Sequence, residues 1–214
     1  MRFQFTSTRR SGREDTPKAQ QILRASRRLL IRKGFADYSA RSVAKEAKIS
    51  LGALQYCFPT LHALLASTLE YVVNNYEAHY VQLERKIEGS AEARLYALLD
   101  YLVDDNWSPE TRKIFFGIWA LSVHSTFARR MMHEMYTYQI ERVSGFIAAA
   151  GPHLSAQHSR DLATQLMAMI EGFCLFSERP TAGTLDKKDM QRLVRELAQR
   201  QLDSAELAAT SMIA

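Results

Sequence analysis

The sequence has only two cysteines among its 214 residues, Cys57 and Cys174, and they lie far apart in unlike surroundings. This scarcity argues against a disulfide framework and fits a reducing compartment. No apolar run reaches about 18 residues, the length that a transmembrane helix needs. The start of the chain also lacks the apolar core of a signal peptide. We therefore expect a cytoplasmic protein that does not cross a membrane.

Sequence signatures of enzymes are missing as well. The chain contains no HExxH, CxxC or GxSxG pattern, and neither of the phosphate-binding patterns GxxxxGK[ST] and GxGxxG. Its six histidines form no pair spaced i, i+4, which would place two metal ligands on one face of a helix. We expect no catalytic residues, no metal and no cofactor, and predict that the protein is not an enzyme.

Breakers of secondary structure are few, with five prolines and nine glycines. Between them apolar residues recur three or four positions apart, and no alternating pattern of a strand occurs. This periodicity predicts an all-α fold of about nine helices, with a loop at 105–107. The expected helices cover residues 17–33, 40–48, 51–58, 61–88, 91–104, 109–123, 126–150, 155–177 and 187–201.

Positive charge is concentrated at the start of the chain. Residues 1–60 hold 13 Lys and Arg against 4 Asp and Glu, a net charge of +9, whereas residues 61–214 hold 15 against 19, a net charge of −4. A basic segment attracts polyanions by counterion release and long-range steering. Ordinary fluctuation of surface charge is the alternative, but the size of the swing favours two parts with different tasks.

Residues 39–58 have the pattern of a helix, a tight turn and a second helix. Val43 and Ala47 lie on the inner face of the first helix, and Leu54 and Phe58, spaced i, i+4, lie on the inner face of the second. Small and polar residues occupy the outer face of the second helix. This arrangement is typical of a helix-turn-helix, although any small helical hairpin shares part of it.

The run AQQILRASRRLLIRKGFADYSARSVAKEAKISLGALQYCFPTLHALL, residues 19–65, resembles the DNA-binding domain of TetR-family transcriptional regulators. The matching features are the Gly34-Phe35 exit from the first helix, the segment 39–44, Ala47, the Ile49-Ser50 turn, and Gly52, Leu54, Tyr56, Phe58 and Pro59. Residues 115–119 and 169–173 are similar to the BetI-type C-terminal domain. The resemblance implies a DNA-binding helix-turn-helix domain of three helices, followed by a larger helical domain for ligand binding and dimerisation.

From this resemblance we expect four segments. They are a disordered basic arm over 1–16, a DNA-binding domain over 17–62, a ligand-binding and dimerisation domain over 63–202, and a flexible tail over 203–214. Arg9, Arg10 and Arg13 in the arm could reach a minor groove, although a tail without a specific role is equally compatible.

Two residues depart from the family pattern. Lys48 stands where members usually carry glycine, so we expect either that Lys48 adopts the turn conformation at some strain or that the turn differs slightly from that of the family. Leu61 stands where members carry a basic residue that contacts phosphate. That contact is either absent here or supplied by Thr60 or His62.

Helix geometry and the resemblance together assign the DNA contacts. Free backbone N–H groups in the first turn of a helix suit phosphate, so Ser39, Arg41 and Ser42 are expected at one backbone strand and Tyr56, Thr60 and His62 at the other. In the reading helix, Gly52 and Ala53 allow close approach, and Leu51 and Ala53 can touch thymine methyl groups. Gln55 is the candidate base reader because its amide can pair with adenine; a solvated side chain is the alternative. Cys57 is expected to be a small neighbour of this surface, with redox activity the alternative.

The second domain is rich in aromatic residues and methionine, which usually form core but can also enclose an apolar ligand pocket. Candidate pocket residues are Trp107, Phe115, Trp119, His124, Tyr136 and Phe173. Candidate dimer-interface residues are Leu162, Leu166, Met169 and Phe173. The expected partners are double-stranded operator DNA, a second copy of the chain and a partly apolar small molecule.

The resemblance thus implies a repressor that a small molecule releases from its operator. Two alternatives remain open. One is a DNA-binding regulator that responds to no ligand. The other is a helical adaptor or enzyme whose first helices only resemble a DNA reader.

Overall fold

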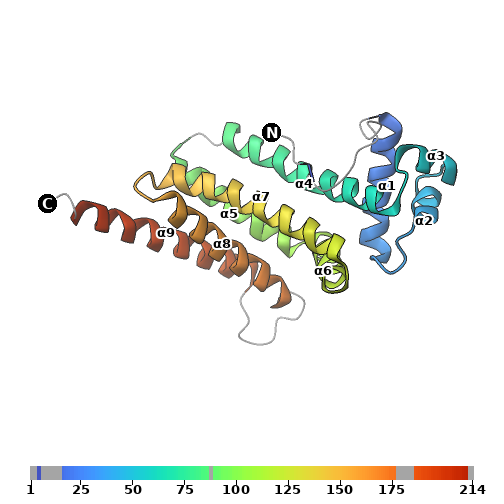
Figure 1. Ribbon diagram of the computed structural model, residues 1–214. Helices are drawn as coiled ribbons and strands as arrows, with labels where there is room; N and C mark the ends of the chain where they lie inside the picture. Colours follow the sequence, from blue (N-terminus) through green and yellow to red (C-terminus); the bar gives the residue numbers. More distant parts are fainter. Residues whose placement is uncertain (1–3, 6–15, 87–88, 177–185, 212–214) are drawn as a thin grey trace. The chain divides into compact units, whose positions relative to one another are not determined.

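The computed structural model describes residues 4–5, 16–86, 89–176 and 186–211. These residues form nine α-helices and one short 3-10 helix, with no strand among them (Figure 1). The predicted all-α fold is therefore confirmed. Arg9, Arg10 and Arg13 lie outside the described residues.

The helices begin and end close to the expected positions. They are α1 (Pro17–Lys33), α2 (Ala40–Glu46), α3 (Leu51–Cys57), α4 (Leu61–Lys86), α5 (Ala91–Trp107), α6 (Pro109–His124), α7 (Thr126–Ala150), α8 (Ala156–Phe173), η1 (Cys174–Phe176) and α9 (Lys187–Ser211). Within the described parts of the chain, no helix has the long apolar stretch that crossing a membrane requires.

Three boundaries differ from the prediction. The helix expected over 155–177 is α8 only up to Phe173, and the 3-10 helix η1 follows it. The expected loop at 105–107 is the last turn of α5, because the proline at position 109 restricts only Ser108, which adopts an extended conformation (φ −71°, ψ 133°). Helix α9 continues to Ser211 instead of ending at residue 201, so the expected tail is helical up to that residue. Pairs spaced i, i+4, such as Gln199 Nε2 donating to Asp203 Oδ1 at 2.7 Å, support the extension.

Hydroxyl side chains fix the starts of several helices, as the sequence predicts. Each accepts a hydrogen bond from a backbone N–H in the first turn, which otherwise has no partner. The pairs are Thr16 with Ala19 (3.2 Å), Ser39 with Ser42 (3.1 Å), Ser50 with Ala53 (3.2 Å), Thr60 with Ala63 (3.0 Å) and Ser155 with His158 (3.1 Å). The breaks between the helices are therefore encoded locally.

The described residues pack as two compact units. Unit 1 contains the chain up to His79 together with Glu110–Met135, and unit 2 contains Tyr80–Pro109 together with the chain from Tyr136 onward. Helices α4 and α7 contribute to both units. This division reflects packing, so the functional boundary expected near residue 62 stays a prediction.

Unit 1 holds α1–α3, the first part of α4, α6 and the start of α7. Its core includes Leu29, Val43 and Leu54, all buried. Ser26 Oγ is hydrogen-bonded to Tyr38 Oη at 2.6 Å and to Thr68 Oγ1 at 2.7 Å, which ties α1 to α4 by a buried polar cluster. Burial raises the pKa of Tyr38 to about 12, so this phenol stays neutral.

The N-terminal arm is described at two positions before the α1 cap. The Phe5 side chain is 3% exposed, and its backbone N–H donates to Glu70 Oε1 on α4 at 2.8 Å. At Phe5, therefore, the segment is packed against unit 1. The expectation of disorder for the rest of the arm stays a prediction.

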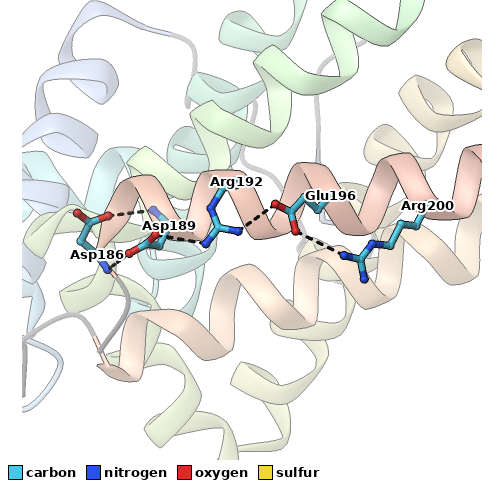
Figure 2. A network of polar contacts seen from close by, with 5 residues as sticks. All are labelled: Asp186, Asp189, Arg192, Glu196 and Arg200. Atoms are coloured by element: carbon cyan, nitrogen blue, oxygen red, sulfur yellow. Dashed lines mark hydrogen bonds and ion pairs between the residues drawn. The ribbon is translucent and has the colours of Figure 1, made fainter. Parts of the chain in front are cut away.

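Unit 2 is built on the packing of α9 against α5 and α8. Two ion pairs close α9 onto α5, one between Arg195 and Asp100 and one between Lys187 Nζ and Asp104 Oδ1 at 2.8 Å. The solvent-facing side of α9 carries a row of charged side chains joined by hydrogen bonds and ion pairs (Figure 2). In it Arg192 contacts Glu196 at 2.9 Å, and Glu196 lies 3.7 Å from Arg200. This side of α9 is therefore polar.

Candidate nucleic-acid interface and ligand domain

The turn between α2 and α3 has the strained conformation, which was one of the two possibilities that the sequence left open. Lys48 has a φ of 56°, the only positive φ among the described residues other than glycine. The Ile49 N–H donates to the Ala44 carbonyl at 3.0 Å, which closes the turn. A left-handed conformation costs a residue with a Cβ about 1–2 kcal/mol. The neighbouring helices therefore hold Lys48 in a conformation that glycine would adopt more easily.

Helix α3 is buried on one side and exposed on the other. Leu54 and Cys57 are 1% and 2% exposed and face the core, as does Phe58 directly after the helix. Gln55 and Tyr56 are exposed, and the Gln55 amide makes no hydrogen bond with another described residue. The outer face of α3 is therefore available to a partner.

The small residues of α3 leave its backbone accessible. A Cβ placed on Gly52 would meet no atom within 4 Å, and Gly52 itself is exposed, while Leu51 and Ala53 are partly buried. A helix with a shallow outer face of this kind fits the width of a major groove. Gly52 thus marks the part of α3 that can approach a partner most closely.

Of the predicted phosphate-contacting residues, Arg41, Tyr56, Thr60 and His62 are exposed, and Ser39 and Ser42 are partly buried. Ser39 and Thr60 use their oxygen atoms to cap α2 and α4, which leaves their hydroxyl protons as donors; in Ser39 that proton is donated to Ser42 Oγ at 2.9 Å. Leu61, at the position of the missing basic residue, is 40% exposed.

His62 has a second contact that the sequence did not indicate. Its ring stacks on the ring of Phe127 at the start of α7, with centroids 4.3 Å apart and planes 15° from parallel. Both residues belong to unit 1. His62 therefore joins the first turn of α4 to α7 while it remains exposed.

The basic surface of unit 1 is partly neutralised. Glu46 on α2 pairs with Arg32 and lies 3.5 Å from Arg28, so one carboxylate serves two arginines of α1. By contrast, no ion pair to another described residue forms at Arg24, Arg41, Lys45 or Lys48. The latter two lysines escaped the sequence-based selection, although their place beside the helix-turn-helix could have suggested them.

The six predicted pocket residues divide between the two units. Phe115, Trp119 and His124 belong to unit 1, and Trp107, Tyr136 and Phe173 belong to unit 2. In unit 1, the Phe115 ring lies 6.4 Å from that of Tyr76, and His124 is exposed. The structure thus brings no more than three of the six into one unit, and the pocket stays a prediction.

The polar residue that stands out in unit 2 is one that the sequence analysis missed. Glu171 on α8 is partly buried and accepts a hydrogen bond from Tyr136 Oη to its Oε2 atom at 2.7 Å. Burial raises the pKa of Glu171 to about 7, and the Tyr136 hydrogen bond opposes this shift. A glutamate among helical residues gives no sequence signal of this environment, because the burial arises from packing.

The four predicted dimer residues differ in their burial within the single chain. Leu162 and Leu166 are 2% and 0% exposed within the single chain, so this part of the apolar stripe packs inside unit 2. Met169 and Phe173 are partly buried. A polar hollow of about 310 Å³ lies beside the stripe, lined by Ser155, Gln157, His158, Asp161, Leu162, Gln165 and Gln201. The assignment of Leu162, Leu166, Met169 and Phe173 to an interface with a second copy stays a prediction.

Known families and solved structures match this architecture. The model of bacterial regulatory proteins of the tetR family matches residues 22–68, and the C-terminal model of BetI-type transcriptional repressors matches residues 91–203, more than half of the chain. The HTH-type transcriptional regulator BetI of Burkholderia thailandensis is 27% identical over 156 residues, which cover 72% of this chain and 78% of that protein. BetI of an Escherichia coli O17:K52:H18 strain is 25% identical over 161 residues, covering 74% and 80%.

Two solved structures share the fold. A transcriptional regulator from Rhodococcus sp. Rha1 superposes with a TM-score of 0.68 at 20% identity, covering 88% of this chain and 97% of that chain. A transcriptional regulator from Saccharomonospora viridis, solved in complex with choline, has a TM-score of 0.67 at 20% identity, with coverage of 84% and 94%. These likenesses show the fold, and the family models show that the chain belongs to the TetR family of transcriptional regulators and carries a C-terminal domain of the BetI type.

Proposed function

We propose that this regulator is a homodimeric repressor that places α3 in the major groove of an operator and that a small molecule releases from it. The observation that carries the proposal is the outer face of α3, where Gly52 meets open space and Gln55 has no partner within the described chain. Because operator DNA in a bacterium lies in the cytoplasm, we place the protein there. The proposal includes no catalytic step.

The DNA contacts follow from the exposed residues around α3. Gln55 reads a base edge, and Leu51 and Ala53 approach thymine methyl groups. Ser39, Arg41 and Ser42 contact one phosphate backbone, and Tyr56, Thr60 and His62 contact the other. Lys45 and Lys48 add positive charge beside these contacts and raise the affinity for any DNA sequence.

Dimerisation supplies the second reading helix. Two α3 helices about 34–36 Å apart would face successive major grooves on a near-palindromic operator. We propose that α8 and α9 form the contact between copies, through Met169, Phe173 and the polar outward residues beside them. An interface of this polarity needs about 800 Å² per partner to be stable.

The ligand acts by population shift. We infer that it binds in the helical domain and favours a conformation whose reading helices no longer match the operator, with a coupling of about 1–3 kcal/mol. The choline bound to the S. viridis regulator supports a small molecule as the class of effector. Contacts inside unit 1, such as the His62–Phe127 stack, connect the DNA-reading helices to α7 and support transmission along this path.

Selection of bound duplexes from a random library, followed by footprinting, tests the DNA-binding part. We expect a two-fold sequence protected on two successive turns. Titration of that operator against candidate small molecules then tests release. An operator affinity that no metabolite mixture changes would support the ligand-independent regulator instead. Failure to select any sequence would reject operator binding.

A further inference from the structure

The Glu171 carboxylate is left with little to balance its charge. Its hydrogen bond from Tyr136 fills one of about four acceptor positions on an ionised carboxylate. Among the described residues, no lysine, arginine or histidine forms an ion pair with Glu171. A partly buried carboxylate in this situation favours a bound cation, because burying an unpaired charge is costly.

A second polar group lies one helical turn from Tyr136. Gln139 is 6% exposed and forms no hydrogen bond with another described residue. Residues three apart lie on neighbouring positions of one helix face, so the Gln139 amide and the Tyr136 side chain leave α7 on the same side. The Gln139 amide atoms keep some contact with solvent, so they can accept a hydrogen bond from a ligand. Both Gln139 and Glu171 therefore gain from a ligand that offers hydrogen-bond donors.

We propose that Glu171, Tyr136 and Gln139 form the polar end of the effector site in unit 2, and that this end binds a protonated amine with N–H donors. This inference rests on the proposed ligand-responsive function and names the chemical class of its ligand. One N–H of the ammonium donates to Glu171, and a second donates to the Gln139 carbonyl oxygen. The alkyl part of the ligand then lies among the apolar residues of the unit.

Charge and hydrogen bonding together select this class. An anion is repelled by Glu171, and an alcohol can donate a hydrogen bond but leaves the carboxylate charge uncompensated. A tetraalkylammonium ion supplies the charge but has no N–H for Gln139. Charge-assisted hydrogen bonds are about twice as strong as neutral ones, so a primary ammonium gains most from the pair of acceptors.

Calorimetric titration of the full-length protein with three probes of equal chain length tests the proposal: n-hexylamine, hexyltrimethylammonium and 1-hexanol. We expect n-hexylamine to bind at least tenfold more tightly than the other two. Glu171→Gln is expected to weaken n-hexylamine at least tenfold, and Gln139→Met about threefold or more. Glu141→Gln, an exposed carboxylate of α7 that pairs with Arg160 at 3.0 Å, should leave binding unchanged.

Several results would overturn the inference. They are equal binding of the quaternary ion or the alcohol, undiminished amine binding by folded Glu171→Gln protein, and no amine binding by the parent. If Glu171→Gln does not fold, the Gln139→Met result decides. Release of the operator by some other ligand, without amine binding, would reject the amine site and leave the proposed function standing. Amine binding that depends on Glu171, in a protein that selects no operator, would reject the function and keep the site.

Discussion

Phe35 occupies the space that a side chain at Gly117 would need. A Cβ built on Gly117 would lie 2.3 Å from Cδ2 of Phe35, which is too close for two non-bonded carbon atoms. Phe35 follows the end of α1 at Gly34, and Gly117 lies in the middle of α6. Both residues belong to unit 1. The Phe35 ring therefore packs against α6 at the position where Gly117 has no side chain.

Gly117→Ala should therefore displace the Phe35 ring. We expect a loss of about 1–3 kcal/mol in the free energy of unfolding, the usual cost of forcing an extra group into a packed contact. Chemical denaturation of parent and variant measures it. Gly145→Ala is the matched control, because its Cβ would meet no atom within 4 Å and alanine favours a helix. A variant at 117 that is as stable as the one at 145 would contradict the packing.

Two substitutions at Lys48 should separate its effect on stability from its effect on DNA binding. Lys48→Gly should be about 1 kcal/mol more stable than Lys48→Ala, because only glycine adopts a φ of 56° at little cost. Both variants remove the same charge, so both should bind duplex DNA more weakly than the parent and by a similar factor. Denaturation curves and salt-dependent DNA titrations measure the two effects. Equal stability of the two variants would show that the turn is not strained.

Gln55→Ala tests the assignment of the base reader. We expect the variant to lose about 1–3 kcal/mol at one operator position and to keep its fold, because Gln55 is exposed and makes no hydrogen bond within the described chain. Gel-shift titration against operators substituted one base pair at a time measures the loss. Gln165→Ala, an exposed glutamine on α8, serves as the control. An unchanged profile for Gln55→Ala would remove Gln55 from the interface.

The raised pKa of Glu171 predicts a stability that falls with rising pH. The folded state holds the proton up to a pKa of about 7, whereas the unfolded chain releases it near the ordinary value of 4.5. Between these values the unfolded state is the more ionised, so this residue destabilises the fold as the pH rises from about 4.5 to 7. The full shift corresponds to at most about 3 kcal/mol.

Glu171→Gln removes this ionisation. Its melting temperature should therefore exceed that of the parent at pH 8, and the difference should disappear at about pH 3, where the parent carboxyl is protonated in both states. Thermal unfolding across this range measures the effect. A difference between the two proteins that stays constant with pH would contradict the shifted pKa.

Local sequence signals account for most of the secondary structure. Hydroxyl caps such as Ser39, Ser50 and Thr60 start helices through hydrogen bonds to residues three positions ahead, so their effect is visible in the sequence. The turn at Lys48 is likewise local and was expected from the family pattern. The last turn of α5 was missed because Asp105 and Asn106 resemble loop residues in composition. The end of α9 was missed because no glycine or proline marks it.

The sequence by itself determined that the protein is helical and where its helix-turn-helix lies, because periodicity, caps and a basic first segment act through neighbours in the chain. Only the tertiary structure decided which polar groups are buried. In the sequence, Glu171 and Gln139 look like any polar surface residue, but in the structure they are partly buried and buried, respectively. Leu162 and Leu166 form an apolar stripe that was assigned to a dimer interface, but both are buried within the single chain. Burial depends on helices that are distant in sequence, such as α7 and α8, and these contacts leave no local pattern.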